Sequence, residues 1–299
     1  MCVRVGSGGR IFLLWSISLC ATPAFGADPF AHDALNRYRA AQAAMSKTRP
    51  AMSGVIEYRQ FDGTGRHALQ PARHSTVHAS GKLNHRIGAG WNVQKNLKHR
   101  RAQSGHQKMQ QTQGSVHVYH RNPASHAAGA FVAVGETHGQ NAEHGTATPE
   151  LRNRRRVATG LEAALFSDKA TLLALAGVRT GDFITLRPES AFAGLGARYY
   201  LTDQLRFEVR GTYEHPLDKT EDAHAYGLTS AIDYRPDELP FSTFGGYRYR
   251  LTEYGRRSAT PDEIRSHGIF AGFRYHFGND TLQEEERFGA LWPDLPEGL

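Results

Sequence analysis

The sequence predicts an all-β fold, an eight-stranded antiparallel up-and-down transmembrane β-barrel with a polar, partly disordered N-terminal extension. Three observations predict it: apolar and polar residues alternate in many segments, an export signal precedes them, and the connections alternate between long and short. The alternation is clearest in residues 204–215, where one face carries Leu205, Phe207, Val209, Gly211 and Tyr213. The other face is charged or hydroxylated, as expected for a strand whose successive side chains point to opposite sides.

The first 26 residues predict a secretory signal. Arg4 and Arg10 precede the apolar segment 11–19, and residues 24–26 place small side chains before a cleavage site that we assign to the bond preceding Ala27. Both cysteines lie in this segment, and the residue before the second is too large for a lipoprotein signal. We therefore expect a cleaved signal peptide, a bacterial outer-membrane location, and neither disulfides nor thiol chemistry.

Composition excludes a helical membrane protein but not a barrel. The mean hydropathy is −0.52 and the apolar fraction is 39%, and no stretch approaches the roughly 20 apolar residues that a membrane helix needs. Barrel strands escape such a scan because their apolar residues alternate with polar ones.

The net charge of +7 is unevenly distributed along the chain. Residues 27–126 hold fifteen lysines and arginines against four acids, whereas residues 279–299 hold six acids against one arginine. The basic part is expected to attract an anionic partner. We expect residues 279–299 to form an acidic tail in the periplasm.

Residues 27–126 are the part that alternation describes least well. Residues 28–48 predict a helix that Pro50 ends. Segments 53–61, 82–94 and 114–121 resemble strands, but the stretches between them are too polar for a separate core. We interpret this region as a partly disordered extension, with the alternative that its strands enlarge the barrel to ten or twelve and open a pore.

The predicted barrel occupies residues 127–278. Its eight segments are each about 12 residues long, close to the length with which a tilted strand crosses a bilayer: 127–138, 156–167, 170–181, 190–202, 204–215, 224–235, 242–254 and 266–278. Long polar connections at 139–155, 182–189, 216–223 and 255–265 alternate with short turns, which predicts loops outside and turns in the periplasm.

Charged residues on the inner face predict a network inside the barrel, because buried charges need partners. Its expected members are Glu162, Arg179, Arg198, Arg206, Glu208, Arg210, Asp233, Arg248 and Arg274. Arginine exceeds acid on this face, so we also expect water inside. The outward tyrosines are candidates for interfacial girdles: Tyr199, Tyr213, Tyr234, Tyr247, Tyr249 and Tyr275.

Residues 193–203 (AGLGARYYLTD) and 268–277 (GIFAGFRYHF) resemble the small outer-membrane barrels of the outer-membrane-protein-A-like and porin-family type. The resemblance implies that the aromatic at the end of the closing strand is read by the barrel-insertion machinery, and Phe277 matches this insertion signal. In many members that aromatic is the last residue, whereas this chain continues to Leu299. We expect a monomer.

The function predicted is that of a structural or interaction barrel whose loops contact lipopolysaccharide or extracellular partners. Arg152, Arg154, Arg155 and Arg156 are expected at the outer rim, where they would bind lipopolysaccharide phosphates. The basic run 95–108 has few aromatics to stack on bases, so we expect no nucleic-acid partner.

The alternative functions are a lipid A-modifying barrel enzyme, a deacylase or acyltransferase, and a larger barrel acting as a small pore. For the enzyme the best local pair is Ser266-His267, but neighbouring strand residues point to opposite faces, so we assign no catalytic residue. His74 and His78, like His117 and His120, lack a third ligand, so no metal and no cofactor is predicted.

Overall fold

A computed structural model describes residues 51–67, 70–104, 107–141, 154–180, 188–217, 223–254 and 263–295. All of them belong to the unit formed by residues 50–299. The helix predicted over residues 28–48 lies outside the described residues. None of the helices among the described residues is long and apolar enough to span a membrane.

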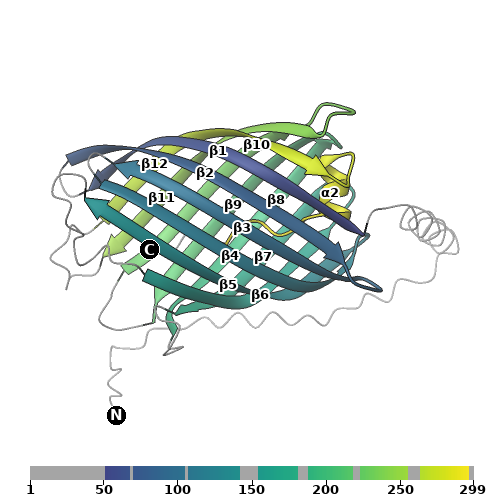
Figure 1. The fold of residues 1–299 in the computed structure, drawn as a ribbon, viewed down its shortest axis with the longest axis horizontal. Coiled ribbons are helices and arrows are strands. Elements are labelled where there is room, and N and C mark those ends of the chain that lie inside the picture. The colour runs from purple at the N-terminus through teal and green to yellow at the C-terminus, as the bar shows by residue number, and fades with distance from the viewer. Residues whose placement is uncertain are drawn as a thin grey trace, which may run out of the picture. The chain divides into compact units, whose positions relative to one another are not determined.

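Twelve antiparallel strands close into one barrel, in which β1 pairs with β12 (Figure 1). The strands are β1 Met52–His67, β2 Gln70–Arg86, β3 Trp91–Ser104, β4 Gln107–Asn122, β5 His126–Asn141, β6 Arg154–Phe166, β7 Ala170–Thr180, β8 Pro188–Thr202, β9 Leu205–Pro216, β10 Ala223–Tyr234, β11 Phe241–Tyr254 and β12 Glu263–Phe277. Each strand pairs with its neighbour in the sequence, so the topology is up-and-down.

The expectation of eight strands is wrong, because residues 52–122 supply β1 to β4. Apolar–polar alternation does not reveal these strands, because their inner residues are amides and cations and few of their outer residues are strongly apolar. In β3, Trp91 and Leu97 are exposed on the outside while Asn92, Gln94 and Asn96 are buried inside. The alternative in which the N-terminal segments enlarge the barrel to twelve strands is the architecture observed.

The faces of the later strands follow the alternation. In β12, Ile269 and Phe273 are exposed, whereas Phe270 and His276 are buried. In β10, Leu228, Ile232 and Tyr234 are exposed while Asp233 is buried. The outside of the barrel is therefore apolar and its lumen polar.

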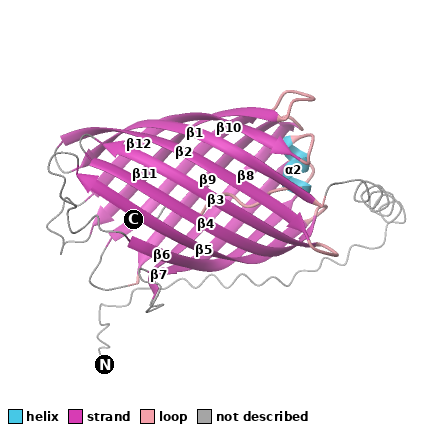
Figure 2. Cartoon of the chain, viewed as in Figure 1, coloured by secondary structure: helices cyan, strands magenta, loops and turns pink. Residues whose placement is uncertain are grey.

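The described turns gather at the end of the barrel where β1 begins and β12 ends (Figure 2). After β12, Gly278 adopts a positive φ of 88° and the chain reverses into helix α2, Leu282–Phe288. The Thr281 side chain caps this helix by accepting a hydrogen bond from the Glu284 backbone N–H, a common N-terminal arrangement. The chain beyond α2 runs inside the barrel (Figure 1).

Several lumenal aromatic rings lie over glycines of the neighbouring strand. Phe244 of β11 faces Gly272 of β12 in register, and a Cβ added at Gly272 would lie 2.5 Å from the Phe244 ring and 2.2 Å from the Tyr58 carbonyl oxygen. The outward Gly211 has no atom within 4 Å of the corresponding position. The Phe244 ring therefore requires glycine at the lumenal position 272, whereas the outward position 211 has room for a side chain.

This arrangement predicts that Gly272→Val lowers the free energy of unfolding by about 1–3 kcal/mol, since overpacking displaces the ring and the strand. The matched change Gly211→Val should stay within about 0.5 kcal/mol of the parent. Urea unfolding in lipid vesicles, followed by gel mobility without boiling, measures both. Equal losses in the two variants would contradict the packing described here.

Candidate functional site

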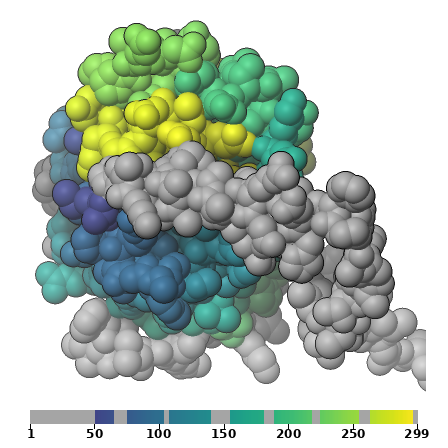
Figure 3. All heavy atoms as spheres, turned by 90° about the vertical axis from the view of Figure 1, so that its right-hand side faces the viewer, coloured from purple at the N-terminus to yellow at the C-terminus, as the bar shows by residue number. Residues whose placement is uncertain are grey.

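The most distinctive feature of the lumen is the chain's own C-terminal part. We call residues 282–295 the C-terminal plug. Seen from the end that carries the turns, the yellow plug lies between the blue early strands and the green late strands (Figure 3). Of the predicted acidic periplasmic tail, residues 279–299, the structure has residues 290–295 among the lumenal side chains, and residues 296–299 lie outside the described residues.

Apolar residues of the plug pack on the inner face of β4 to β8. Leu291 and Trp292 are buried in a cluster with Tyr119, Ala127, Ala164, Phe166 and Leu173. The rings of Trp292 and Tyr119 meet edge to face with centroids 5.4 Å apart. Leu295 joins a second cluster with Phe131, Ala133, Ala158 and Phe192. The lumen thus has an apolar strip that only the plug covers among the described residues.

One amide side chain binds the backbone of the plug. Gln94 of β3 is fully buried, and its Oε1 accepts from the backbone N–H groups of Leu291 and Trp292 at 2.9 and 3.1 Å. Its Nε2 donates to the Trp292 carbonyl oxygen at 2.9 Å. Irregular backbone inside a barrel needs such partners, because unpaired buried peptide groups are costly.

One fully buried carboxylate attaches α2 to the wall of the barrel. Glu286 is 1% exposed and accepts hydrogen bonds from Arg198 at 2.6 Å, from Thr171 at 3.0 Å and from the Tyr200 hydroxyl. Arg121 donates to the carbonyl oxygens of Glu286 and Gly289 at 3.2 and 2.9 Å. These cations therefore satisfy both the acid and the C-terminal carbonyl groups of the helix.

The structure pairs most of the inward charges named from the sequence. Arg206 and Arg274 both contact Asp233, Arg198 contacts Glu208 at 3.0 Å, and Arg179 contacts Glu214. Glu162 instead lies 2.8 Å from His117 Nδ1. Arg210 donates to the Asp294 carbonyl oxygen at 3.2 Å, and Arg248 lines a lumenal pocket.

Sequence reasoning missed three acids that join this network. Glu57 of β1 contacts Arg59 and Arg274, Glu286 contacts Arg198, and Asp294 lies 3.5 Å from Lys82. Two of the three come from the plug. The opposite charges of residues 27–126 and 279–299 were the available signal, since here they meet inside one barrel.

Two chains of contacting Ser, His and Glu side chains lie in the lumen. Ser242 Oγ lies 2.7 Å from His276 Nε2, and His276 Nδ1 contacts Glu285 of α2. Ser115 Oγ lies 2.9 Å from His117 Nε2, whose ring also contacts Glu162. The order of groups matches a hydrolytic triad. However, Ser242 has no exposed surface, so the first chain joins the plug to the wall and offers no nucleophile to a substrate.

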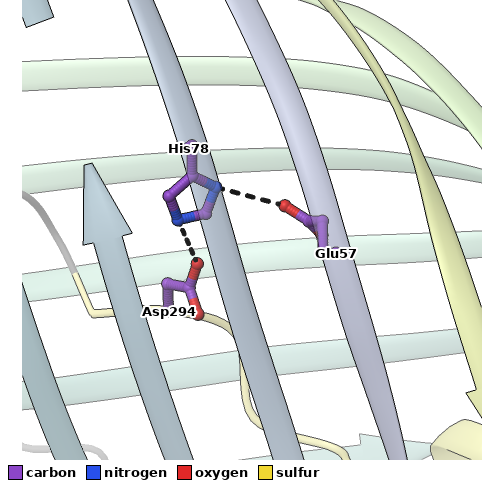
Figure 4. Close-up of side chains that lie close together, drawn as sticks. All are labelled: Glu57, His78 and Asp294. Atoms are coloured by element: carbon purple, nitrogen blue, oxygen red, sulfur yellow. Dashed lines mark ion pairs between the residues drawn. The ribbon is translucent and has the colours of Figure 1, made fainter. Parts of the chain in front are cut away.

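Glu57, His78 and Asp294 are the three described residues whose ligand atoms come close enough to hold a metal ion. The His78 ring lies between the two carboxylates, with Nδ1 3.5 Å from Glu57 and Nε2 3.6 Å from Asp294 (Figure 4). A metal ion would use one nitrogen of the ring together with both carboxylates, whereas here each nitrogen faces a different carboxylate. Arg59, Arg274 and Lys82 contact the same carboxylates, so the cluster bridges strand and plug by charge and does not fit a cation.

Of the four arginines predicted to bind lipopolysaccharide, Arg155 and Arg156 can be placed, and these two lie on different faces. Arg152 and the side chain of Arg154 lie outside the described residues. Arg155 is exposed on the outer face, 3.3 Å from Glu136, whereas Arg156 lines a pocket on the lumenal side. Ser266 is half-buried and His267 exposed, so that pair diverges. Phe277 ends β12 as expected, and its ring lies against Gly54.

No family model matches the chain, and no curated protein matches it. Among solved structures, an outer membrane channel from Pseudomonas putida F1 superposes with a TM-score of 0.50 at 12% identity, covering 76% of this chain and 95% of that one. The translocator domain of the autotransporter NalP from Neisseria meningitidis gives 0.48 at 13% identity, covering 83% and 97%.

The attachment of the plug predicts that Glu286→Ala releases it, because removing one partner of a buried ion pair costs about 3–5 kcal/mol. In a Trp91→Phe background beginning at residue 27, Trp292 is the one remaining tryptophan and reports the plug. Acrylamide should quench its fluorescence several-fold more strongly after Glu286→Ala. Asp280→Asn, at an exposed residue, is the control; equal quenching in both would contradict the anchor.

Plug docking should also depend on pH. Burial raises the pKa of the Asp294 carboxyl, but Lys82, Lys98 and His78 outweigh it, so this pKa lies below its ordinary value. A lowered pKa stabilises the docked state above the ordinary aspartate pKa of about 4. Trp292 quenching should therefore stay low at neutral pH and rise as the pH falls below about 4. In Asp294→Asn the rise should be smaller. A quenching profile identical to that of the parent would show that Asp294 does not cause the pH dependence.

The superposition on the Pseudomonas putida outer membrane channel confirms the resemblance to outer-membrane barrels at the level of the fold. The chain is a closed antiparallel β-barrel of the kind that such a channel forms.

Proposed function

We propose that this protein is an outer-membrane channel for small polar solutes and that its own C-terminal plug holds it closed. The observation that carries the proposal is a charged lumen wide enough to admit an extended segment of the chain. Side chains alone fill a barrel of eight strands, whereas sixteen strands leave an aqueous channel. A barrel of twelve lies between these limits.

The outer surface supports insertion in a membrane. Leu161, Leu195 and Ile269 are 69%, 70% and 69% exposed, which is unfavourable in water and expected against lipid. Exposed aromatics lie toward both ends of the strands, as in interfacial girdles: Tyr199, Tyr234, Phe241 and Tyr275 on the turn side, and Tyr213 and Tyr226 on the other.

The orientation follows from the connections. Outer-membrane barrels have short periplasmic turns, so the end with the described turns and α2 would face the periplasm. The exposed Arg155 would then lie toward the leaflet that carries lipopolysaccharide, where its charge favours lipid phosphates. The plug would close the channel from the periplasmic side.

The lumen remains partly open around the plug. One polar pocket lies between the plug and β1, β9 and β12, with Glu57, Arg206, Arg274 and Glu285 among its lining. A second lies beyond the end of the plug. Displacing or shifting the plug would join these spaces into a continuous polar path.

The test is conductance in planar lipid bilayers. The intact chain should show rare or small openings, and a chain ending at residue 281 should conduct at least tenfold more. Glu286→Ala is a second variant that keeps the full chain, and it should open more often than Asp280→Asn. A truncated chain that still shifts its gel mobility on heating but never conducts would overturn the channel proposal.

A further inference from the structure

The pocket beyond the end of the plug is strongly basic. It lies among β1, β3, β9, β10, β11 and the plug residues Asp294 and Leu295. Five basic side chains line it: Arg59, Lys98, Arg210, Arg248 and Arg250. The acids of its lining are Glu214 and Asp294, so the charge of the lining is +3. This charge favours an anionic solute over a cationic one.

Both acids already have cationic partners outside those five. Glu214 contacts Arg179 and accepts a hydrogen bond from Ser190 at 2.7 Å. Asp294 lies 3.5 Å from Lys82. The two acids of the lining are therefore too few to neutralise its five cations by themselves.

The geometry of β11 favours an oxyanion with several charged groups. Arg248 and Arg250 are two positions apart, so they point to the same face of the strand. Their register partners on β10 are Thr229 and Gly227, a hydroxyl and a residue without a side chain. Two guanidinium groups, each able to bind a carboxylate with two hydrogen bonds, thus belong to the same part of the pocket lining.

An acidic residue of the plug already lies among these cations. Arg210 lines the pocket and donates to the Asp294 carbonyl oxygen at 3.2 Å. Lys98 lines the pocket and also stabilises the ionised Asp294 carboxylate. Asp294 therefore already interacts with two of the five cations, with Arg210 through its carbonyl oxygen and with Lys98 through its carboxylate.

We propose that this pocket binds a small solute carrying two or more carboxylates, in competition with Asp294. The inference rests on the proposed channel, for which it names the class of solute. The incoming carboxylates take over Lys98 and Arg210 and weaken the attachment of the plug. Binding of solute and docking of plug therefore oppose each other, and the coupling acts equally in both directions.

The experiment is calorimetric titration of the detergent-purified chain with propane-1,2,3-tricarboxylate at low salt. Arg248→Gln combined with Arg250→Gln should weaken binding at least tenfold. Asp294→Asn should strengthen it at least threefold, because it removes the competing charge. The matched control is Arg101→Gln, an exposed arginine of β3, which should bind as the parent does.

Equal affinity in the double variant and in Arg101→Gln would overturn the proposal, provided that both keep their heat-dependent gel shift. Tighter binding of inorganic phosphate than of the tricarboxylate, or comparable binding of uncharged glycerol, would overturn the assignment to carboxylates. Binding is read at equilibrium without a membrane. A barrel that binds but never conducts refutes the channel alone, and one that conducts without binding refutes the site alone.

Discussion

The structure depends on charge balance between the wall of the lumen and the plug. The inner face of the barrel carries more cations than acids, and a buried cation without a partner is costly. Glu286 meets Arg198, Tyr200 and Thr171, and Asp294 lies between Lys82 and His78. The acids that the strands lack are thus supplied by the residues that follow β12. Because another anion can bind the same cations of the wall, such an anion would compete with the plug for them.

Alternation located the later part of the barrel well, because its outer residues are strongly apolar and its inner ones charged or small. It failed for β1 to β4, where the inner residues are Asn, Gln, His and Lys and resemble a disordered segment in composition. In β3 Asn92, Gln94 and Asn96 are all buried, and Gln94 is hydrogen-bonded to the backbone of the plug. A sequence does not show that amides are buried until their partners are known.

The lumenal site could be predicted only in part for the same reason. The pairs Arg206–Asp233 and Arg198–Glu208 join neighbouring strands, so adjacency along the chain places them together. Apart from His276–Glu285, the hydrogen bonds by which side chains hold the plug join residues more than 80 positions apart, as in Arg198–Glu286 and Gln94–Trp292. Leu291 and Trp292 were nevertheless a usable signal, since apolar residues beyond the closing strand need a surface to cover them.

The most direct test of this account is a cross-link between the plug and the wall. The chain from residue 27 onward has no cysteine, so Gln94→Cys with Leu291→Cys creates a single inward pair. A short bifunctional maleimide should join this pair in the folded barrel and change its mobility on a denaturing gel. Lys95→Cys with Leu291→Cys places one thiol on the outer face and should not react in this way. Equal cross-linking of both pairs, or of neither, would show that the C-terminal segment does not occupy the lumen.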